Sequence, residues 1–162
     1  MAVKNDDTEK DHWNHLNADD LYRKAMNYIA EEKPQHAVDG LSILVEKFPQ
    51  YSKNPDALLS MGKIYCDQFH EFDNAILCYK KMIEGYPDNP LTAQAYFMKG
   101  FIYSNYFQQF DSAKIYYNSF LEKYPGHELV PSVQFELNNM GQDIDGIIPA
   151  ESDTLSSKEI KP

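Results

Sequence analysis

The sequence predicts an all-α fold, a right-handed α-solenoid of three helix pairs followed by a C-terminal capping helix. The first observation is an internal repeat, because residues 57–87 and 95–125 align at a spacing of about 38 residues, a length typical of stacked helix pairs. The second observation is that proline and helix-capping residues stand where helices are expected to begin. The identical pairs include Ala57/Ala95, Gly62/Gly100, Ile64/Ile102, Tyr65/Tyr103, Phe72/Phe110, Asp73/Asp111, Ala75/Ala113, Tyr79/Tyr117 and Pro87/Pro125.

The first helix pair is expected over residues 19–51. Residues 20–32 carry apolar side chains at three- and four-residue spacing, which predicts an amphipathic helix. Proline is tolerated in the first turn of a helix, so the second helix is expected to begin at Pro34 and to end before Pro49.

The second and third pairs are expected over residues 54–88 and 89–126. They open with Asn54-Pro55 and Asn89-Pro90, in which the asparagine is expected to cap the helix and the proline to occupy its first position.

The second helix of each of these pairs is expected to begin at an aspartate. Asp73 and Asp111 can cap free amides, and their charge favours a helix N-terminus. Phe72 and Phe110, one residue earlier, are expected to staple the two turns.

A capping helix is expected over residues 128–141, where apolar side chains alternate with polar ones before Gly141. Its apolar residues are Val130, Val133, Phe135 and Leu137. The solvent-exposed face is expected to carry Gln134, Glu136, Asn138 and Asn139.

The chain is therefore divided into a repeat domain, residues 19–142, and two acidic tails. The tails, residues 1–18 and 143–162, hold much of the acidic charge and no hydrophobic period, so both are expected to be disordered. The net charge of −10, without a stripe of Lys and Arg, argues against binding to nucleic acid or anionic lipid. No apolar run is long enough to insert into a membrane.

The sequence offers no catalytic or cofactor site. It contains no glycine-rich phosphate loop, nucleophile elbow or zinc-protease motif, so we expect no enzyme and no cofactor. His12 and His15 stand close together, but no further ligands follow nearby, and we expect no metal site. Cys66 and Cys78 are interpreted as small buried or half-buried thiols rather than as a disulfide.

The repeat resembles the tetratricopeptide family over residues 19–141. In that family a small residue of the first helix faces an alanine of the second helix, and a proline closes the unit. The matching residues are Ala25, Ala37 and Pro49 in the first unit, Gly62, Ala75 and Pro87 in the second, and Gly100, Ala113 and Pro125 in the third. The second and third units have one more residue between their helices than the first. Gly62 and Gly100 are expected to let Ala75 and Ala113 pack closely.

A narrower resemblance concerns the ends of the units. The sequences Glu-Lys-Phe-Pro at 46–49, Glu-Gly-Tyr-Pro at 84–87 and Glu-Lys-Tyr-Pro at 122–125 are similar to those of bacterial cell-envelope repeat proteins, such as the outer-membrane barrel-assembly lipoprotein and the Tol-Pal-associated coordinator. This resemblance implies a location in the periplasm or cell envelope. A signal peptide is absent from this sequence, which leaves a cytoplasmic location as the alternative.

The tetratricopeptide resemblance also implies a binding site. In such arrays the first helix of each pair lines a concave groove, and by that analogy Ile29, Cys66, Asp67 and Ser104 face the groove. Phe97 and Phe101 are the strongest candidate anchors, since rigid aromatic side chains bury a large area. The partner-binding residues predicted in this way are Tyr22, Met26, Leu59, Lys63, Phe97, Phe101 and Asn105.

The expected function is that of a non-catalytic module that binds a peptide or helix of another protein in its concave groove, within a bacterial cell-envelope assembly. The alternative is a structural scaffold subunit that acts by lateral docking or by self-association. The sequence leaves the oligomeric state open, and it leaves open whether the groove or the outer face binds.

Overall fold

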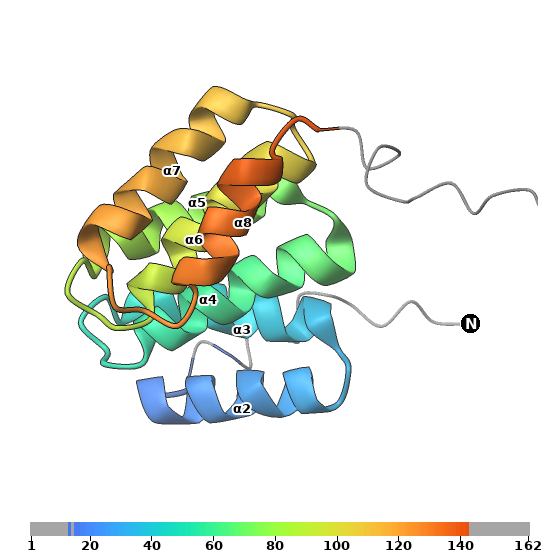
Figure 1. Cartoon of the computed structure of the whole chain (residues 1–162). Helices are drawn as coiled ribbons and strands as arrows, with labels where there is room; N and C mark the ends of the chain where they lie inside the picture. Colours follow the sequence, from blue (N-terminus) through green and yellow to red (C-terminus); the bar gives the residue numbers. More distant parts are fainter. Residues whose placement is uncertain (1–12, 14, 143–162) are drawn as a thin grey trace, which may run out of the picture.

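The computed structural model describes Trp13 and residues 15–142, and in this part of the chain all regular structure is helical (Figure 1). The predicted all-α fold is therefore confirmed. In chain order the α-helices are α2 (Ala18–Ala30), α3 (Pro34–Lys47), α4 (Asn54–Ile64), α5 (Phe72–Gly85), α6 (Thr92–Asn105), α7 (Phe110–Lys123) and α8 (Val130–Asn139), with a π-helical turn, η1 (Tyr65–Phe69), after α4.

Neighbouring helices in the chain are also neighbours in space. Helix α2 packs against α3, α4 against α5 and α6 against α7, and each pair contacts the next. The buried side chains form three clusters along the stack, and Val45 and Tyr65 border both the first and the second of them. This nearest-neighbour packing is consistent with the predicted helical repeat solenoid.

A tyrosine closes over a glycine in both the second and the third helix pair. A Cβ atom at Gly62 would stand 2.5 Å from the ring of Tyr79, and one at Gly100 would stand 2.6 Å from the ring of Tyr117. Both tyrosines are almost completely buried. The tyrosine rings that fill the space above the glycines were not predicted from the sequence, while Ala75 and Ala113, which were expected to pack closely, are fully buried.

The asparagine expected to cap α4 bonds to the preceding helix pair instead. Asn54 is the first residue of α4, is fully buried and donates from Nδ2 to the carbonyl oxygen of Phe48 at 2.7 Å. Thr92, at the equivalent position of α6, donates from Oγ1 to the carbonyl oxygen of Tyr86 at 2.6 Å. The predicted capping role of Asn54 is therefore wrong, and these side chains tie each new helix to the end of the previous pair.

Helix α6 begins later than predicted, at Thr92. The Oδ1 atom of Asn89 accepts a hydrogen bond from the amide of Leu91 at 2.9 Å, so this asparagine stabilises the turn before the helix and not the helix itself. His127 has the same role before α8, where its Nδ1 atom accepts from the amide of Leu129 at 3.1 Å.

The second helices begin one residue before the aspartates that were expected to cap them. Helices α5 and α7 start at Phe72 and Phe110, so Asp73 and Asp111 lie within the first turn, where a negative charge still favours the helix N-terminus. Phe72 stacks on Tyr106 of the next pair at a centroid distance of 3.9 Å. Phe72 therefore contacts the next helix pair, in addition to its position at the turn of its own pair.

The additional residue of the second unit lies between its two helices, as predicted. In the first unit the amide of Lys33 donates to the carbonyl oxygen of Tyr28, five residues earlier, whereas in the second unit Glu71 donates to Tyr65, six residues earlier, both at 2.8 Å. The turn η1 thus accommodates the residue as a wider helical turn. The chain then reverses through left-handed residues, which are Glu32, His70 and Gln108 in the three units.

Trp13 lies in the core, although the sequence predicts a disordered tail over residues 1–18. It is 3% exposed, and a Cβ atom at Gly40 would stand 2.7 Å from its ring. Leu16 packs on the same cluster. The predicted tail is therefore wrong at these two residues. Residues 1–12, residue 14 and the predicted tail at 143–162 lie outside the described residues.

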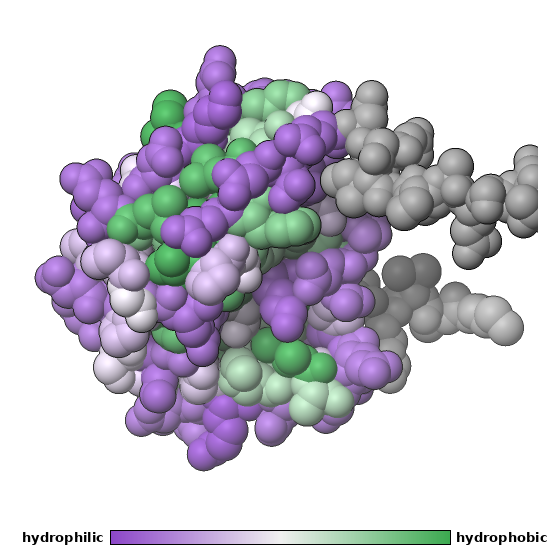
Figure 2. All heavy atoms as spheres, in the orientation of Figure 1, coloured by the Kyte–Doolittle hydropathy of each residue, from purple (hydrophilic) through white to green (hydrophobic). Residues whose placement is uncertain are grey.

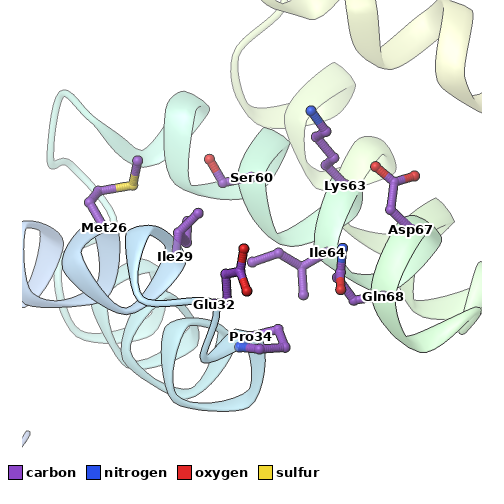
Figure 3. A pocket seen from close by; sticks show the side chains of 9 residues that line it. All are labelled: Met26, Ile29, Glu32, Pro34, Ser60, Lys63, Ile64, Asp67 and Gln68. Carbon is purple, nitrogen blue, oxygen red and sulfur yellow. The ribbon is translucent and has the colours of Figure 1, made fainter.

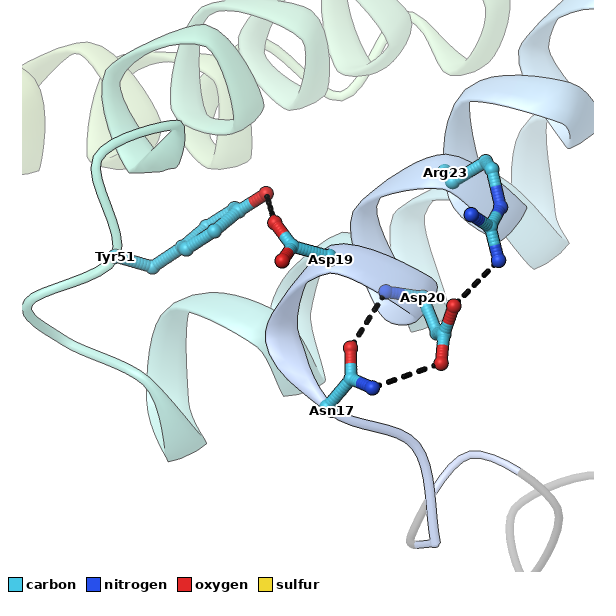
Figure 4. Close-up of polar contacts among 5 residues, drawn as sticks. All are labelled: Asn17, Asp19, Asp20, Arg23 and Tyr51. Carbon is cyan, nitrogen blue, oxygen red and sulfur yellow. Dashed lines mark hydrogen bonds and ion pairs between the residues drawn. The ribbon is translucent and has the colours of Figure 1, made fainter.

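The start of α2 is fixed by polar contacts (Figure 4). The Oδ1 atom of Asn17 accepts from the amide of Asp20 at 2.9 Å and caps the helix, while the Asp20 carboxylate pairs with Arg23. The hydroxyl of Tyr51 donates to the carboxylate of Asp19 at 2.7 Å. This last bond joins the start of α2 to the connection between the first and second pairs.

The capping helix α8 covers the last pair and is shorter than predicted. Val133 is fully buried, and Val130 and Leu137 pack beside it. Phe135, in contrast, is 64% exposed and does not belong to the packed face. Glu136, which was expected on the solvent-exposed face, is half-buried and approaches the side chain of Asn105.

Candidate functional site

A cleft of about 660 Å³ lies where the C-terminal half of α2 meets α4 and η1 (Figure 3). The first helices of two successive pairs thus supply its walls. Helix α2 contributes Met26 and Ile29, and α4 contributes Ser60, Lys63 and Ile64, with their side chains around one common space. The remaining lining residues are Glu32, Pro34, Asp67 and Gln68.

The cleft combines an apolar wall with charges at its edge. Lys63 and Asp67 are both exposed and stand four residues apart, and Glu32 adds a second carboxylate from the turn after α2. Among the described residues Lys63 forms no ion pair. An unpaired ammonium and two carboxylates beside aliphatic side chains can bind an apolar anchor with charged flanks.

The turn η1 shapes one end of this cleft. It carries Asp67 and Gln68, and it lies where the second unit has one residue more than the first. The sequence locates that residue but contains no signal for a π-helical turn. Turns of this kind are frequent at functional sites.

A second group of predicted residues gathers on α6. The rings of Phe97 and Phe101 stack at a centroid distance of 6.2 Å, and Asn105 donates to the carbonyl oxygen of Phe101 at 3.1 Å. Helix α8 reaches this group through Glu136, whose Oε2 atom lies 3.5 Å from the Nδ2 atom of Asn105. The ring of Phe97 also lies 6.0 Å from that of Tyr117, so it takes part in the packing of the third pair.

The structure thus separates the predicted partner-binding residues. Met26 and Lys63 line the cleft together with Ile29 and Asp67, whereas Phe97, Phe101 and Asn105 form the group on α6. Tyr22 and Leu59 do not line the cleft, since Tyr22 contacts the ring of Tyr51 and Leu59 packs on the second core cluster. Their role in binding stays a prediction.

Cys66 and Ser104 do not face the groove, contrary to expectation, because both are buried. The two cysteines are free thiols within the structure, as interpreted from the sequence. Burial raises the pKa of the Cys78 thiol to about 11, and burial together with the nearby carboxylate of Asp67 raises the pKa of Cys66. Both thiols are therefore protonated and weakly nucleophilic at neutral pH.

Phe135 is a surface residue that the sequence interpretation missed, because it was assigned to packing. It stands one repeat length after Phe97 and continues the row of Leu59 and Phe97 onto α8. Its spacing of one repeat length from Phe97 is the signal in the sequence that could have identified Phe135. Figure 2 shows hydrophobic surface in separate patches on this face, near α8 and near α2, with hydrophilic surface between them.

The part of the chain that the structure describes holds neither a metal-binding cluster nor a membrane-spanning helix. Within it, no group of three or more His, Cys, Asp or Glu side chains is arranged to hold a metal ion. His12 lies outside that part, so the proximity of His12 and His15 has no structural counterpart here. None of the described helices has the length and apolarity needed to cross a membrane.

Comparison with known proteins agrees with this geometry. A family model described as tetratricopeptide repeat matches residues 94–127, which cover most of α6, all of α7 and the turn that follows. Together with the equivalent helix pairs upstream, the match supports a tetratricopeptide repeat protein. A comparison with curated proteins gives no match. Tetratricopeptide repeats generally mediate protein–protein interactions and are not catalytic.

Proposed function

We propose that this protein is a non-catalytic interaction module that binds an extended segment or a helix of a partner protein in its concave groove. The cleft between α2 and α4 is the observation that carries the proposal. It joins apolar side chains of two successive first helices to an ammonium group, Lys63, that has no ion pair among the described residues. A groove of this kind buries an apolar side chain of the partner and orients its charged neighbours.

The cleft favours a particular kind of segment. Met26 and Ile29 offer aliphatic and thioether contacts, which adapt to differently shaped apolar side chains. Glu32 and Asp67 outnumber Lys63 at the edge, so a basic residue beside the apolar anchor adds favourable electrostatic energy. We therefore propose that the bound segment is apolar with a basic flank.

The cell-envelope setting is a further part of the proposal. It is supported by the resemblance of the unit ends, at 46–49, 84–87 and 122–125, to bacterial cell-envelope repeat proteins. We propose the periplasm as the compartment, with the cytoplasm as the alternative. Fractionation of the native organism with an antibody against the protein tests this part independently of the groove.

Selection of a random peptide library on the full chain tests the groove. Selected peptides should share an apolar residue next to a basic one, and the Met26→Ala/Asp67→Lys double variant should weaken their binding more than about tenfold, because it removes an apolar contact and replaces a carboxylate that attracts the basic residue with an ammonium group. Ile115→Ser, on an exposed position of α7, is the control and should bind as the native chain does. Equal binding to both variants would contradict the groove.

Lateral docking or self-association is a second candidate, and one observation favours it. Leu77 of α5 and Ile115 of α7 stand one repeat length apart and are 53% and 63% exposed. They place two large aliphatic side chains at equivalent positions on the second helices. Light scattering over a range of concentrations tests self-association. A mass that rises with concentration and falls in the Leu77→Ser/Ile115→Ser variant supports it, and a constant monomer mass argues against it.

A further inference from the structure

Lys99 of α6 is a buried cation without an anionic partner. Its side chain belongs to the buried set, with 3% of the residue exposed. Among the described residues its ammonium lies over the ring of Tyr116, 4.2 Å from the centroid, and it has no ion pair or hydrogen bond there. A ring face satisfies an ammonium group only in part, since that group has three N–H donors.

The packing of the repeat does not require a lysine at this position. Met61 occupies the equivalent position of α4, one repeat length earlier, and is also buried. The chain itself thus shows that an apolar side chain of similar length fits between successive pairs. A charge at this place costs desolvation energy that methionine avoids.

A pocket of about 280 Å³ opens beside the Lys99 side chain. Tyr103 and Tyr116 form one wall of it, with their rings stacked at a centroid distance of 5.6 Å and an interplanar angle of 6°. Helix α5 also lines the pocket, through Ile76 and Ile83. The pocket therefore has apolar walls and a cation, with the volume of a small organic group.

The charges around the pocket leave it positive. Lys80 and Glu84 of α5 line it as well, and they pair with each other at 3.8 Å on the exposed side. The positive charge of Lys99 is therefore not balanced within the pocket, although the protein as a whole has a net charge of −10. Burial, and then the charge of Lys80, lower the pKa of Lys99, although the carboxylate of Glu84 offsets part of this shift. An anion bound beside the ammonium would remove this penalty.

We propose that this pocket binds a carboxylate group, which accepts hydrogen bonds from the Lys99 ammonium and lies against the two stacked tyrosines. The site is formed by α5, α6 and α7 and shares no residue with the cleft between α2 and α4, so it is distinct from the proposed groove. Leu77 and Ile115, which are exposed, directly neighbour the pocket residues Ile76 and Tyr116 in the chain. A carboxylate presented by an apolar surface fits these surroundings.

Titration of the full-length protein with sodium acetate, followed by amide NMR shifts, tests the site. At matched ionic strength, acetate should produce saturable shifts at Lys99, Tyr103 and Tyr116 that chloride does not produce. Lys99→Met should fold, because methionine stands at the equivalent position, and should weaken acetate binding by more than about tenfold, since it removes a charge-assisted hydrogen bond. Lys24→Met removes a lysine at the matching position of α2 and should leave binding unchanged.

Three outcomes would overturn the proposal. The first is an equal response to acetate in the native chain and in a folded Lys99→Met variant. The second is a response to chloride or to inorganic phosphate as large as that to acetate, because the site would then not be one for carboxylates. The third needs no substitution, namely acetate shifts that centre on residues outside α5, α6 and α7. None of these outcomes bears on peptide binding in the concave groove.

Discussion

Tyr79 and Tyr117 show how single residues determine the spacing of the helices. Each ring lies where the Cβ atom of any residue other than glycine would stand, over Gly62 and Gly100 respectively. The two glycines are therefore needed for close approach rather than for backbone freedom. A methyl group at either position would push a fully enclosed aromatic ring out of place, and densely packed interiors resist such a shift.

Gly100→Ala should destabilise the protein by about 1 to 3 kcal/mol, because the new Cβ would overlap the ring of Tyr117. Helix propensity alone predicts the opposite sign, since alanine is favoured over glycine within a helix. Gly85→Ala at the end of α5 is the matched control, because a Cβ atom there would have no neighbour within 4 Å, and it should be neutral or stabilising. Urea unfolding followed by circular dichroism measures both variants. Equal stabilities would contradict the packing described here.

The stability of the protein at alkaline pH should depend on two groups whose pKa values are raised in the folded state, the thiol of Cys78 and the hydroxyl of Tyr51. Burial raises the pKa of Cys78 from 9.0 to about 11, so the folded state holds this proton more tightly than the unfolded state does. The resulting stability is complete below pH 9 and is lost as the pH rises towards 11. The pKa of Tyr51 is raised from 10.0 to about 12 by burial and by its hydrogen bond to Asp19. The stability that depends on this proton is therefore lost as the pH rises from 10 towards 12.

The free energy of unfolding should therefore fall by about 1.4 kcal/mol per pH unit over the interval between pH 9 and 11 that the Cys78 thiol controls. Cys78→Ala should flatten the decline between pH 9 and 11, even if it lowers stability at pH 7. Chemical unfolding at several pH values gives the two slopes. Parallel slopes for the native chain and the variant would show that this thiol does not couple to folding.

At the scale of elements, the turns between helices set the differences among the units. The first turn closes with a hydrogen bond five residues back, from Lys33 to Tyr28. The second contains the π-helical turn η1, in which the amide of His70 donates to the carbonyl oxygen of Tyr65, and it closes with a bond six residues back, from Glu71 to the same oxygen. The helices on either side keep small buried residues at equivalent positions, with Ala25 and Gly62 in the first helices and Ala37 and Ala75 in the second. A repeat can thus change in length without loss of its core, provided that the change falls in the turn.

Deletion of Gln68 tests this independence. The shortened turn would match that of the first unit, so the protein should still unfold cooperatively, with a modest loss of stability. Deletion of Lys80, within α5, is the matched control, since it rotates all later residues of that helix by about 100° and displaces Met82 from the core. Thermal unfolding should separate the two clearly. A Gln68 deletion as damaging as the Lys80 deletion would show that the turn and the core are not independent.

The helix pairs could be predicted from the sequence because their small residues and closing prolines recur at a fixed spacing. The capping roles of Asn54 and Asn89 were predicted less well, although α4 does begin at Asn54. An asparagine next to proline can cap a helix, stabilise a preceding turn or bond to an earlier carbonyl, and the same residue types serve all three roles. Only the position of the preceding pair decides among them.

The candidate site was predictable in part for similar reasons. Met26 and Lys63 follow from the resemblance to tetratricopeptide arrays, in which the first helices line the groove, whereas the contribution of Gln68 depends on the shape of η1. Trp13 was missed because one aromatic residue in a polar segment forms no periodic pattern. Cys66 and Ser104 were assigned to the groove wrongly, because spacing alone does not show which side the next pair covers.

At the scale of the whole molecule, the stack must end without exposing an apolar face. Helix α8 achieves this with Val133 turned to the core, and it carries Asn138 at the position that glycine has in α4 and α6. A following helix could not approach closely there, since asparagine leaves no room for a tyrosine ring. Helix α8 therefore terminates the array.

A chain that ends at Gly126 should be less stable than one that ends at Gln142, by about 2 kcal/mol or more, because Val133 and its neighbours no longer cover the last pair. It should also associate more strongly through the exposed surface. Calorimetry and analytical ultracentrifugation compare the two chains, and the longer one retains all of α8. Identical melting temperatures would show that α8 does not contribute to the core.

Photo-crosslinking tests the central claim, that the face of the first helices binds a partner segment, most directly. A peptide selected on the full chain would carry a photoreactive group at its apolar anchor, and the crosslinked residues would be identified by mass spectrometry. We expect crosslinks at Met26, Ile29 and Lys63, with loss of crosslinking in the Met26→Ala/Asp67→Lys variant. Crosslinks confined to Leu77, Ile115 and other outward positions of α5 and α7 would contradict the claim.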